Sequence, residues 1–498
     1  NKWFLKTENL KIKMGSSEFS TVKKKDNETA EEKKERLSKT KRFGNYAYMK
    51  ADYFDFQTPV EFKASQFKGY TMGVQNVDGS LLDQYRTDSL TTREKQTYVK
   101  IDSIGKKYTL DSKVKVLTAL LRGKFTIGMV DIDPLQTKYN RYEGFRLGAG
   151  FKMNERFNRY ISPDVYLAYG FKDRDWKYGA GIDFRTTLER NSFFRVEYFH
   201  DVAASGRFSQ NLWNMKMTIN NTGMSIQNDK YYKYDGFRVG YQIDLSNSLT
   251  LNVSANRQTE EAGFDYQFMN QSRRFDNFSS LATIKFSPNS KNIMTPAGKY
   301  TYDQNFPEVY FNYEQGYKTL GGDFNYSRLD ILYTHQFRTI LGNTGTRVYG
   351  GYYLGEAPIW HAFEMGGLDS NKNTGILSNF NFTTYLGFAT MTAGKYFNDK
   401  FAGYFITHRI PWYFKSFGKN TSSFDFIYKG VIGNMKNPEY HQFEFSPLDH
   451  LYQEVGLEYN NFLSSRFNLG FFYRVGHYAN NNFKDNFAVQ LKLKLLEF

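Results

Sequence analysis

From about Tyr139 to the C-terminus, apolar and polar residues alternate along short segments that are separated by clusters of Asn, Asp, Gly and Ser. This period of two is the signal of half-buried β-strands. In the segment 176–185, one face carries Trp176, Tyr178, Ala180, Ile182 and Phe184, and the other carries Lys177, Gly179, Gly181, Asp183 and Arg185. Segments 194–201, 328–337 and 467–476 alternate in the same way. Each predicted strand therefore has one apolar face and one ionic or small face.

The alternation predicts about sixteen strands, an even number, as bacterial barrels favour. They are expected at residues 139–153, 161–173, 176–187, 192–202, 234–247, 249–268, 275–288, 306–322, 324–340, 345–356, 385–397, 399–411, 422–435, 452–462, 467–479 and 486–498. If both chain ends lie on the periplasmic side, this count leaves the long segment 203–233 on the side where turns should be short. One early strand is therefore expected to be miscounted.

Alternation alone does not tell which face meets water, because a soluble β-sandwich also alternates, with its apolar face inward. Three features favour lipid as the neighbour of the apolar face. Aromatic residues sit at the ends of the apolar faces, the polar faces mix cations, carboxylates and Gly, and the segments have the length of about 10 residues that a tilted strand needs to cross a bilayer. Hydrocarbon offers no hydrogen-bond partner, so such strands must close. We predict an all-β fold, a transmembrane antiparallel β-barrel, over residues 136–498.

Residues 1–135 follow a different pattern and are predicted to form a small, mixed α/β periplasmic segment ahead of the barrel. The segment 22–41 is a run of charged residues, typical of a solvated helix or loop. Apolar residues at helix-like spacing occupy 93–121, before Gly123. Because no signal peptide begins at Asn1, we expect targeting and further sequence upstream of these residues.

Composition excludes several classes of protein. Of the 498 residues, 18% are aromatic, 40% hydrophobic and 23% charged, which is too apolar for intrinsic disorder. No stretch approaches ~18 consecutive apolar residues, which excludes helical membrane spans. The absence of Cys removes disulfides, thiolate metal sites and cysteine nucleophiles.

The formal net charge is 66 − 51 = +15, which suits an anionic surface. Cations near strand ends are expected to meet outer-membrane lipid and the phosphates of lipopolysaccharide. Nucleic acid is not expected as a partner. Its binding needs cations interleaved with accessible aromatics, whereas here the aromatics alternate away from the cations.

The segment 139–150 stands where the alternating region begins, and it contains the motif Tyr142, Glu143, Gly144, Phe145 and Arg146. It resembles the start of the barrel in BamA-like outer-membrane proteins, the superfamily of insertases, two-partner secretion transporters and patatin-linked barrels. More closely, it resembles an uncharacterised Bacteroidota family in which a carboxypeptidase-regulatory-like domain and a periplasmic segment precede the barrel. Segment 397–411, which ends in Arg-Ile-Pro, resembles a late-barrel signature of that family.

This resemblance covers roughly residues 60–498. It implies an outer-membrane protein of a Gram-negative bacterium that acts with other outer-membrane or periplasmic proteins in transport or assembly. The motif also fits an ordinary strand in which glycines relieve crowding where a wall curves. Segment 234–241 repeats its pattern of an aromatic, an acid, Gly, Phe and Arg, which supports that second interpretation.

In BamA-like barrels, a long loop folds back into the lumen and carries an Arg-Gly-aromatic tip that pairs with carboxylates of the lumen. The resembling segment here is 356–384, with the candidate residues Glu364, Gly366, Gly367 and Asp369. The Gly-Gly pair is similar, but no Arg-Gly-aromatic follows it, which puts insertase or secretion activity in doubt. A plain surface loop is the alternative interpretation.

The sequence contains no recognisable catalytic or metal-binding pattern. No catalytic, cofactor-binding or metal-binding residue is therefore predicted, and the chain is not expected to be an enzyme. The seven His residues show no HExxH spacing, and no GxSxG elbow occurs. A sequence like a calcium loop begins at Asp369, but it has Thr374 where Gly is needed and Phe380 where Glu is needed. The adjacent pairs His200-Asp201 and Asp449-His450 would point to opposite faces of a strand.

The last segment, 486–498, is an amphipathic strand that ends on an aromatic residue, which resembles the signal read by outer-membrane assembly machinery. Its candidate signal residues are Leu491, Leu493, Leu495 and Phe498. Three functions therefore stay open. A transport or assembly barrel comes first, a passive porin or ligand-uptake barrel is the alternative, and an outer-membrane enzyme is disfavoured.

Overall fold

The computed structural model describes residues 5–20, 29, 31, 40–53, 56, 61, 63, 69–71, 89, 91–107, 109, 124–206, 212, 228–295, 298–369, 387–415, 421–462 and 467–493. The chain divides into two compact units, Asn1–Gln66 with Gln75–Ser103, and Phe67–Val74 with Ile104–Phe498. In the first unit, β1 (Thr7–Ser20) and β2 (Thr40–Asp52) form an antiparallel hairpin, and the helix α3 (Thr92–Lys107) begins. The division at residue 135 into a periplasmic and a membrane part stays a prediction.

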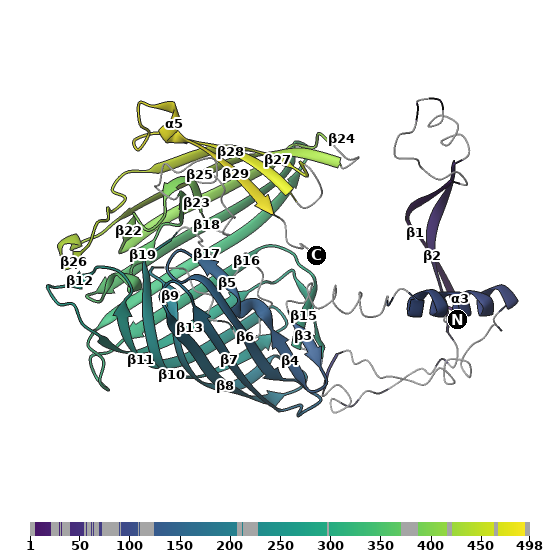
Figure 1. Ribbon diagram of the computed structural model, residues 1–498, viewed down its shortest axis with the longest axis horizontal. Coiled ribbons are helices and arrows are strands. Elements are labelled where there is room, and N and C mark those ends of the chain that lie inside the picture. The colour runs from purple at the N-terminus through teal and green to yellow at the C-terminus, as the bar shows by residue number, and fades with distance from the viewer. Residues whose placement is uncertain are drawn as a thin grey trace. The chain divides into compact units, whose positions relative to one another are not determined.

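The second unit is built on one large antiparallel sheet whose strand order is that of a closed barrel (Figure 1). Its wall strands are β4 (Val130–Asp133) with β5 (Lys138–Asn140), β6 (Gly144–Met153), β7 (Ile161–Gly170), β8 (Asp175–Thr187), β9 (Ser192–Ala204), β10 (Tyr231–Ser246), β11 (Leu249–Ala262), β13 (Phe275–Phe286), β16 (Glu308–Gly316), β17 (Tyr326–Thr339), β18 (Gly342–Gly355), β23 (Lys400–Arg409), β25 (Thr421–Asn434), β27 (Tyr452–Asn460), β28 (Phe467–Val475) and β29 (Phe487–Leu493). With β4 and β5 counted as one broken strand, the described residues contain sixteen wall strands. Short β3 (Phe125–Ile127) pairs with β4, and β24 (Phe414–Lys415) pairs with β25.

Smaller elements lie in the connections between wall strands. They are η2 (Pro134–Gln136), β12 (Gln267–Phe268), β14 (Lys291–Thr295), β15 (Gly298–Asp303), η3 (Ile359–His361), β19 (Phe363–Glu364), β20 (Gly367–Asp369), β21 (Phe388–Thr392), β22 (Phe397–Asn398), η6 (Pro438–Tyr440), β26 (His441–Gln442) and α5 (Phe483–Asn486). In the strand order, β29 is followed by β3. Residues 494–498, which follow β29, lie outside the described residues.

The prediction of one continuous strand over residues 139–153 is wrong, because the chain turns back at residues 141–143. Segment 138–140 of β5 pairs with segment 144–146 of β6 across this turn. β4 then continues along β6 opposite residues 150–153. The broken strand β4–β5 is therefore the early strand that was miscounted. With this broken strand included in the count, the long connection from β9 to β10 lies at the rim opposite the one where β4 begins and β29 ends.

The prediction of a wall strand at residues 385–397 is also wrong. β21, in that segment, pairs in parallel with β20, and β22 pairs with β19. In the wall, β18 pairs directly with β23. Because one wall strand is added and one is removed, the number of wall strands equals the sixteen that the alternation predicted.

The two faces of the wall differ as the alternation predicted. On the outer face, Trp176 of β8 is 52% exposed and Ile331 of β17 is 43% exposed. Their inward neighbours Lys177 and Asp330 are 1% and 3% exposed. Soluble proteins bury apolar groups and leave charges outside, so this reversed arrangement is that of a barrel that spans a membrane. Among the described residues, no helix is long and apolar enough to cross a membrane.

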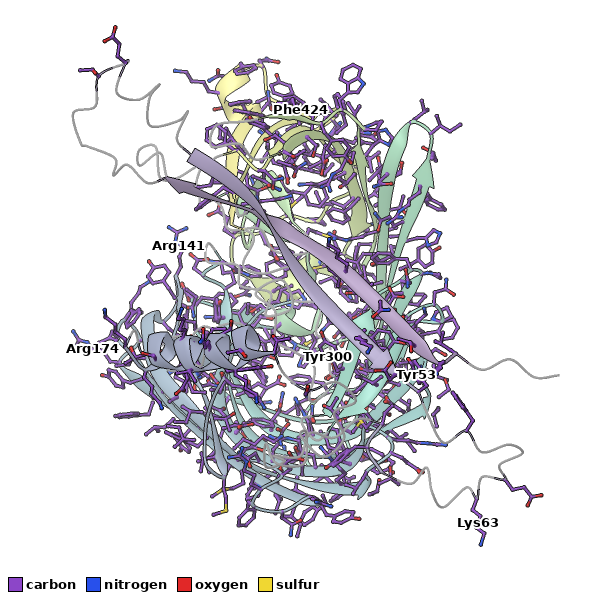
Figure 2. All side chains as sticks on the ribbon, turned by 90° about the vertical axis from the view of Figure 1, so that its right-hand side faces the viewer. Tyr53, Lys63, Arg141, Arg174, Tyr300 and Phe424 are labelled. Atoms are coloured by element: carbon purple, nitrogen blue, oxygen red, sulfur yellow. The ribbon has the colours of Figure 1, made fainter. Side chains whose placement is uncertain are left out.

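Cations lie at the rim opposite the one where β4 begins and β29 ends. Arg141 lies in the β5–β6 turn and Arg174 in the β7–β8 turn, and Figure 2 shows both on the same side of the wall. The Lys172 ammonium donates to the carbonyl oxygen of Arg141, so these two turns contact each other. This rim therefore presents positive charge beside the apolar outer face.

Replacing Ile331 by Arg would place a charge on the outer face near the middle of β17. We expect the free energy of folding into lipid vesicles to fall by about 2–4 kcal/mol, the cost of an arginine at the bilayer midplane. The matched variant Phe337→Arg changes the same face near the end of β17 and should lose only about 0–1 kcal/mol. Urea titrations in vesicles, followed by tryptophan fluorescence, measure both. Equal losses would contradict a path of β17 across the bilayer.

Candidate functional site

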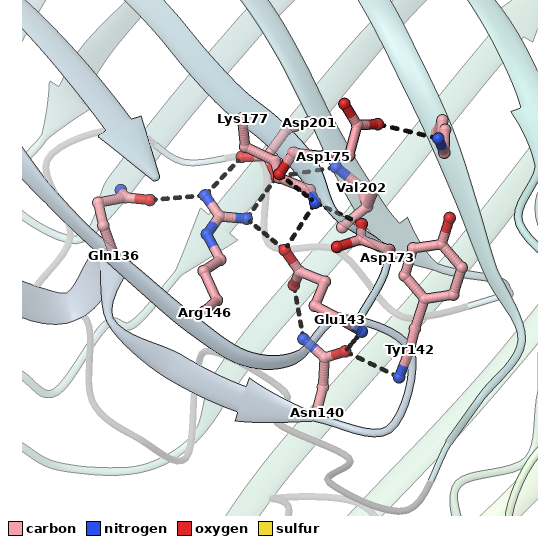
Figure 3. Close-up of polar contacts among 11 residues, drawn as sticks. Gln136, Asn140, Tyr142, Glu143, Arg146, Asp173, Asp175, Lys177, Asp201 and Val202 are labelled. Atoms are coloured by element: carbon pink, nitrogen blue, oxygen red, sulfur yellow. Dashed lines mark hydrogen bonds and ion pairs between the residues drawn. The ribbon is translucent and has the colours of Figure 1, made fainter. Parts of the chain in front are cut away.

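The motif at the start of the barrel builds an ion-pair network on the inner face of the wall (Figure 3). The side chains of Glu143 and Arg146 are fully buried, with 3.3 Å between Arg146 Nη1 and Glu143 Oε1. The same guanidinium donates to both carboxylate oxygens of Asp201, at 2.6 and 3.1 Å, and to Gln136 Oε1 at 2.9 Å. Because Asp201 lies on β9, this bidentate pair connects the β5–β6 hairpin to a strand three positions along the wall.

A second cation and the turn itself complete the network. Lys177 Nζ lies 3.6 Å from Glu143 Oε1 and forms an ion pair with Asp173. The Asn140 side-chain amide donates to Glu143 Oε2 at 2.6 Å, and its carbonyl oxygen accepts the backbone N–H groups of Tyr142 and Glu143. An Asn side chain that binds the backbone two residues on stabilises a tight turn. Both charges of the motif are therefore buried with partners, as burial requires.

The remaining motif residues hold the turn in place. Tyr142 stacks on Tyr231 of β10, with ring centroids 5.4 Å apart. Gly144 has a φ of +69°, and a Cβ there would lie 2.9 Å from Lys172 Cβ, so the turn requires glycine. Phe145 points outward and is 49% exposed. All five motif residues thus belong to one hairpin that the network attaches to the inner wall.

The long connection between β18 and β23 folds into the barrel and binds its inner wall; we call residues 356–369 and 387–399 the plug. Glu260 on β11 is fully buried and accepts hydrogen bonds from Trp360 Nε1 at 2.6 Å and His361 Nε2 at 2.8 Å. Gln258 and Asn277 donate to its other oxygen at 2.7 and 2.9 Å. One wall carboxylate therefore accepts four hydrogen bonds, two of them from the plug.

Aromatic packing surrounds this contact. The rings of plug, loops and inner wall form one buried cluster, which includes Tyr266, Phe268, Phe275, Phe324, Tyr326, Tyr349, Tyr353, Trp360, Phe363, Phe388, Phe397, Phe401 and Tyr452. Phe363 is 0% exposed, and the Arg328 guanidinium lies 4.6 Å from its ring centroid, a cation–π contact. The plug is therefore packed as a protein core is packed.

A second wall carboxylate binds the other half of the plug. Glu454 of β27 accepts the backbone N–H and the hydroxyl of Thr390, both at 2.8 Å. Lys429 of β25 pairs with the other oxygen of Glu454 at 2.8 Å and donates to the carbonyl oxygen of Gly387 at 3.0 Å. The plug is thus attached at two opposite parts of the strand order, β11 and β25–β27.

The candidate loop residues lie within the plug and shape it. The Glu364 carboxylate accepts the backbone N–H groups of Gly366 at 2.9 Å, Gly367 at 3.3 Å and Gly394 at 3.2 Å. Asp369 ends β20, the strand that pairs with β21. Glu364 therefore joins the two halves of the plug through backbone groups that glycines leave accessible. Its assignment to a network with lumen cations stays a prediction.

The proposed C-terminal signal lies on β29, which pairs with β28. Leu491 pairs with Leu469, and Leu493 pairs with Phe467. Leu495 and Phe498 lie outside the described residues. Their role in assembly stays a prediction.

Sequence reasoning missed the residues that hold the plug. Glu260 and His361 are 101 positions apart, and Thr390 and Glu454 are 64 apart. No local spacing connects residues so distant. The one available signal is that Glu260 and Glu454 occupy inward positions of alternating strands, where a buried carboxylate needs partners.

A cavity of about 220 Å³ remains beside the network, lined in part by Arg195, Glu197 and Asp201. Arg195 donates to Asp164, Asp183 and Glu197 at 2.7 to 2.9 Å, so the charges around the cavity pair with one another. In the part of the chain that the structure describes, no group of three or more His, Cys, Asp or Glu side chains could hold a metal ion.

Comparison with known proteins gives one family match. Residues 122–415 match the C-terminal domain of a family of unknown function, DUF5686. No curated protein matches the chain. Among solved structures, BamA from Haemophilus ducreyi lacking POTRA domains 1–3 is 9% identical with a TM-score of 0.47, over 74% of this chain and 70% of that chain. CdiB from Acinetobacter baumannii is 11% identical with a TM-score of 0.35, over 72% of this chain and 57% of that chain.

Replacing Arg146 by Met would leave the carboxylates of Glu143 and Asp201 buried without their main cation. We expect a loss of about 3–5 kcal/mol in the free energy of unfolding, the usual cost of breaking a buried ion pair. Arg274→Met is the control, because Arg274 pairs with Glu261 on the surface and such pairs contribute about 0–1 kcal/mol. Urea unfolding of both variants in vesicles provides the comparison. A loss under 1 kcal/mol for Arg146→Met would show that the network does not hold the hairpin.

Lowering the pH should loosen the loop that carries β26. Burial lowers the pKa of His441 to about 4, and the Tyr266 hydroxyl lies 2.8 Å from its Nδ1. A His with a lowered pKa is neutral when folded, so its contribution to stability is complete above about pH 6.5 and decreases as the pH falls toward 4. Limited proteolysis of segment 435–451 at pH 7 and pH 4.5 should show faster cleavage at the lower pH. In His441→Asn the pH effect should shrink, and an unchanged effect would contradict the assignment.

Proposed function

The chain belongs to the DUF5686 family, whose function is unknown, and from that premise we propose that it is a plugged transport or assembly barrel of the BamA-like type and not an enzyme. In this proposal, the barrel lies in the outer membrane of a Gram-negative bacterium of the Bacteroidota. It exports, inserts or displays a protein or lipid together with partner proteins. The plug closes the interior at rest and moves when a substrate engages.

The observation that carries the proposal is the attachment of the plug. One oxygen of Glu260 accepts hydrogen bonds from both Trp360 and His361. Both side chains can therefore separate from Glu260 together if the loop moves. BamA-like loops are held by an Arg on lumen carboxylates, and here an indole and an imidazole take the place of that Arg. A carboxylate in a dry interior binds such donors strongly, because water does not compete. The contact can therefore hold a resting state.

A passive porin fits the interior less well. An open pore needs a continuous water-filled path lined by polar side chains. Here aromatic rings of the plug pack against the wall, with Phe363 and Phe397 both 0% exposed. Removal of the plug would have to precede any diffusion through the barrel.

The proposed contacts with partner proteins rest on residues 1–135, and the proposed contacts with lipid rest on the cations at the rim. Residues 1–135 provide a part of the chain that could receive a periplasmic client or partner subunit. Arg141, Lys172 and Arg174 support contact with the phosphates of lipopolysaccharide at the rim opposite the ends of the sheet. An attraction of this kind weakens as salt increases.

Conductance in planar bilayers tests the plug. The intact protein should show a small or closed state, and Glu260→Ala should open large, frequent conductance steps because Trp360 and His361 lose their acceptor. Glu261→Ala, the next residue on the same strand, is the matched control and should behave as the intact protein does. A steady, size-dependent conductance of the intact protein would favour the porin instead.

Depletion in the native host tests the wider function. We expect the outer membrane to lose a defined set of proteins or surface lipids, measured by quantitative proteomics and lipid analysis of purified outer membranes. An outer membrane of unchanged composition would contradict a role in transport or assembly.

A further inference from the structure

The connection between β13 and β16 folds back onto the inner face of the wall. It contains the hairpin of β14 and β15, and Figure 1 shows β15 and β3 at one end of the barrel and β12 and β26 at the other. Lys299 of β15 pairs with Asp244 of β10 at 3.0 Å and donates to the Thr250 hydroxyl of β11 at 3.5 Å. Asp244 and Thr250 point inward and are each 6% exposed. Asn292 of β14 donates to the carbonyl oxygen of Asn247, in the β10–β11 turn, at 2.9 Å. The hairpin is therefore bound to the interior of the barrel as well as to its edge.

A short segment from ahead of the barrel binds the same hairpin. Met294 of β14 is 5% exposed, and its backbone N–H donates to the Thr71 hydroxyl at 3.1 Å. The neighbouring Tyr70 hydroxyl accepts a hydrogen bond from Arg185 of β8, also at 3.1 Å. In the strand order, β9, β10 and β11 lie between β8 and the strands that carry the hairpin. Residues 70 and 71 therefore connect the hairpin to a distant part of the wall.

The chain on both sides of this segment belongs to the other compact unit. Residues Phe67–Val74, which we call the strap, are part of the barrel unit, and residues 69–71 of the strap are described. Asn1–Gln66 and Gln75–Ser103 form the first unit. The chain thus reaches the barrel unit at the strap, leaves it, and returns at Ile104. A displacement of the first unit acts on the strap through the covalent backbone at both of its ends.

We propose that hairpin β14–β15 is a movable cover of the barrel mouth, which the strap holds closed and which opens when the first unit draws the strap away. The hydrogen bonds and the ion pair described above join the cover to the wall and the strap. Each such hydrogen bond contributes little net free energy, whereas the wall strands pair along their length, so the cover can open while the wall stays folded.

The cover lies on one side of the mouth, because its contacts and its two ends belong to strands from β8 to β16. When closed, it should therefore exclude large molecules more than ions. In the proposed transport, the plug controls one mouth and the cover controls the other. This role of the cover rests on the proposed function, whereas the contacts that hold the cover are separate from those that hold the plug.

The reactivity of a cysteine at position 294 measures the cover, because the chain has no Cys of its own and Met294 is buried. In the full-length protein with Met294→Cys, a water-soluble maleimide should label slowly. Thr71→Val and Tyr70→Phe should each raise the labelling rate about 2- to 10-fold, the effect of one lost hydrogen bond on an opening equilibrium. Tyr70→Phe is the discriminating variant, because the hydrogen bond that it removes is made to β8 and not to the hairpin. Lys291→Met is the matched control and should leave the rate unchanged, because Lys291 pairs with Asp303 inside the hairpin.

A second reporter separates opening of the cover from general loosening. Ala389 lies in the plug and is 1% exposed, so Ala389→Cys reports on the plug alone. Its labelling should stay slow in Thr71→Val and Tyr70→Phe, and all variants should keep the heat-dependent gel mobility of a folded barrel. Equal labelling at position 294 in all variants, or a parallel increase at position 389, would overturn the proposal.

Conductance in planar bilayers tests the cover as a gate. Lys299→Met should enlarge the conductance steps of Glu260→Ala and admit larger polyethylene glycols, whereas Lys291→Met should change neither. Steps of unchanged size in Lys299→Met would overturn the gating role. If Glu260→Ala stays closed while labelling at position 294 still responds to the strap variants, the proposed function fails and the cover stands.

Discussion

The structure depends on the pairing of every backbone N–H and C=O inside the wall. A bilayer interior offers no competing hydrogen-bond partner, so a β-sheet can cross it only when neighbouring strands satisfy each other all the way round. Among the described residues, successive antiparallel pairings join the wall strands in order from β4–β5 to β29. Once the sheet is closed, each strand must point alternate side chains to lipid and to the interior. The apolar outer face and the ionic inner face both follow from that single constraint.

The enclosed interior then sets its own requirement. Charges such as Arg146, Lys177 and Glu260 are removed from bulk water and need partners, which they find on strands and loops far away in sequence. The same carboxylates that the wall must satisfy become attachment points for the plug. Under the proposed function, stability and the closed resting state therefore use the same side chains. A change at one of them should affect both properties.

Much of the wall could be predicted from the sequence because its signal is local. Trp176 and Lys177 reveal their faces through their immediate neighbours. The turn at 141–143 was missed because Tyr139 and Phe145, on either side of it, keep the even spacing of one strand face. The features that make the chain turn are the Asn140 side chain and the positive φ of Gly144. The prediction of a wall strand at 385–397 failed because the apolar residues of β21 pack in the plug and do not face lipid. The contact of His361 with Glu260 joins distant positions, and no local pattern encodes it.

The central claim is that alternate residues of a wall strand face lipid and the enclosed interior. Because the chain has no Cys, single cysteines can be introduced one at a time along residues 328–333 of β17 and labelled with a fluorophore in vesicles that contain brominated lipid. We expect strong quenching at 329, 331 and 333 and weak quenching at 328, 330 and 332. Uniform quenching, or the opposite alternation, would contradict it.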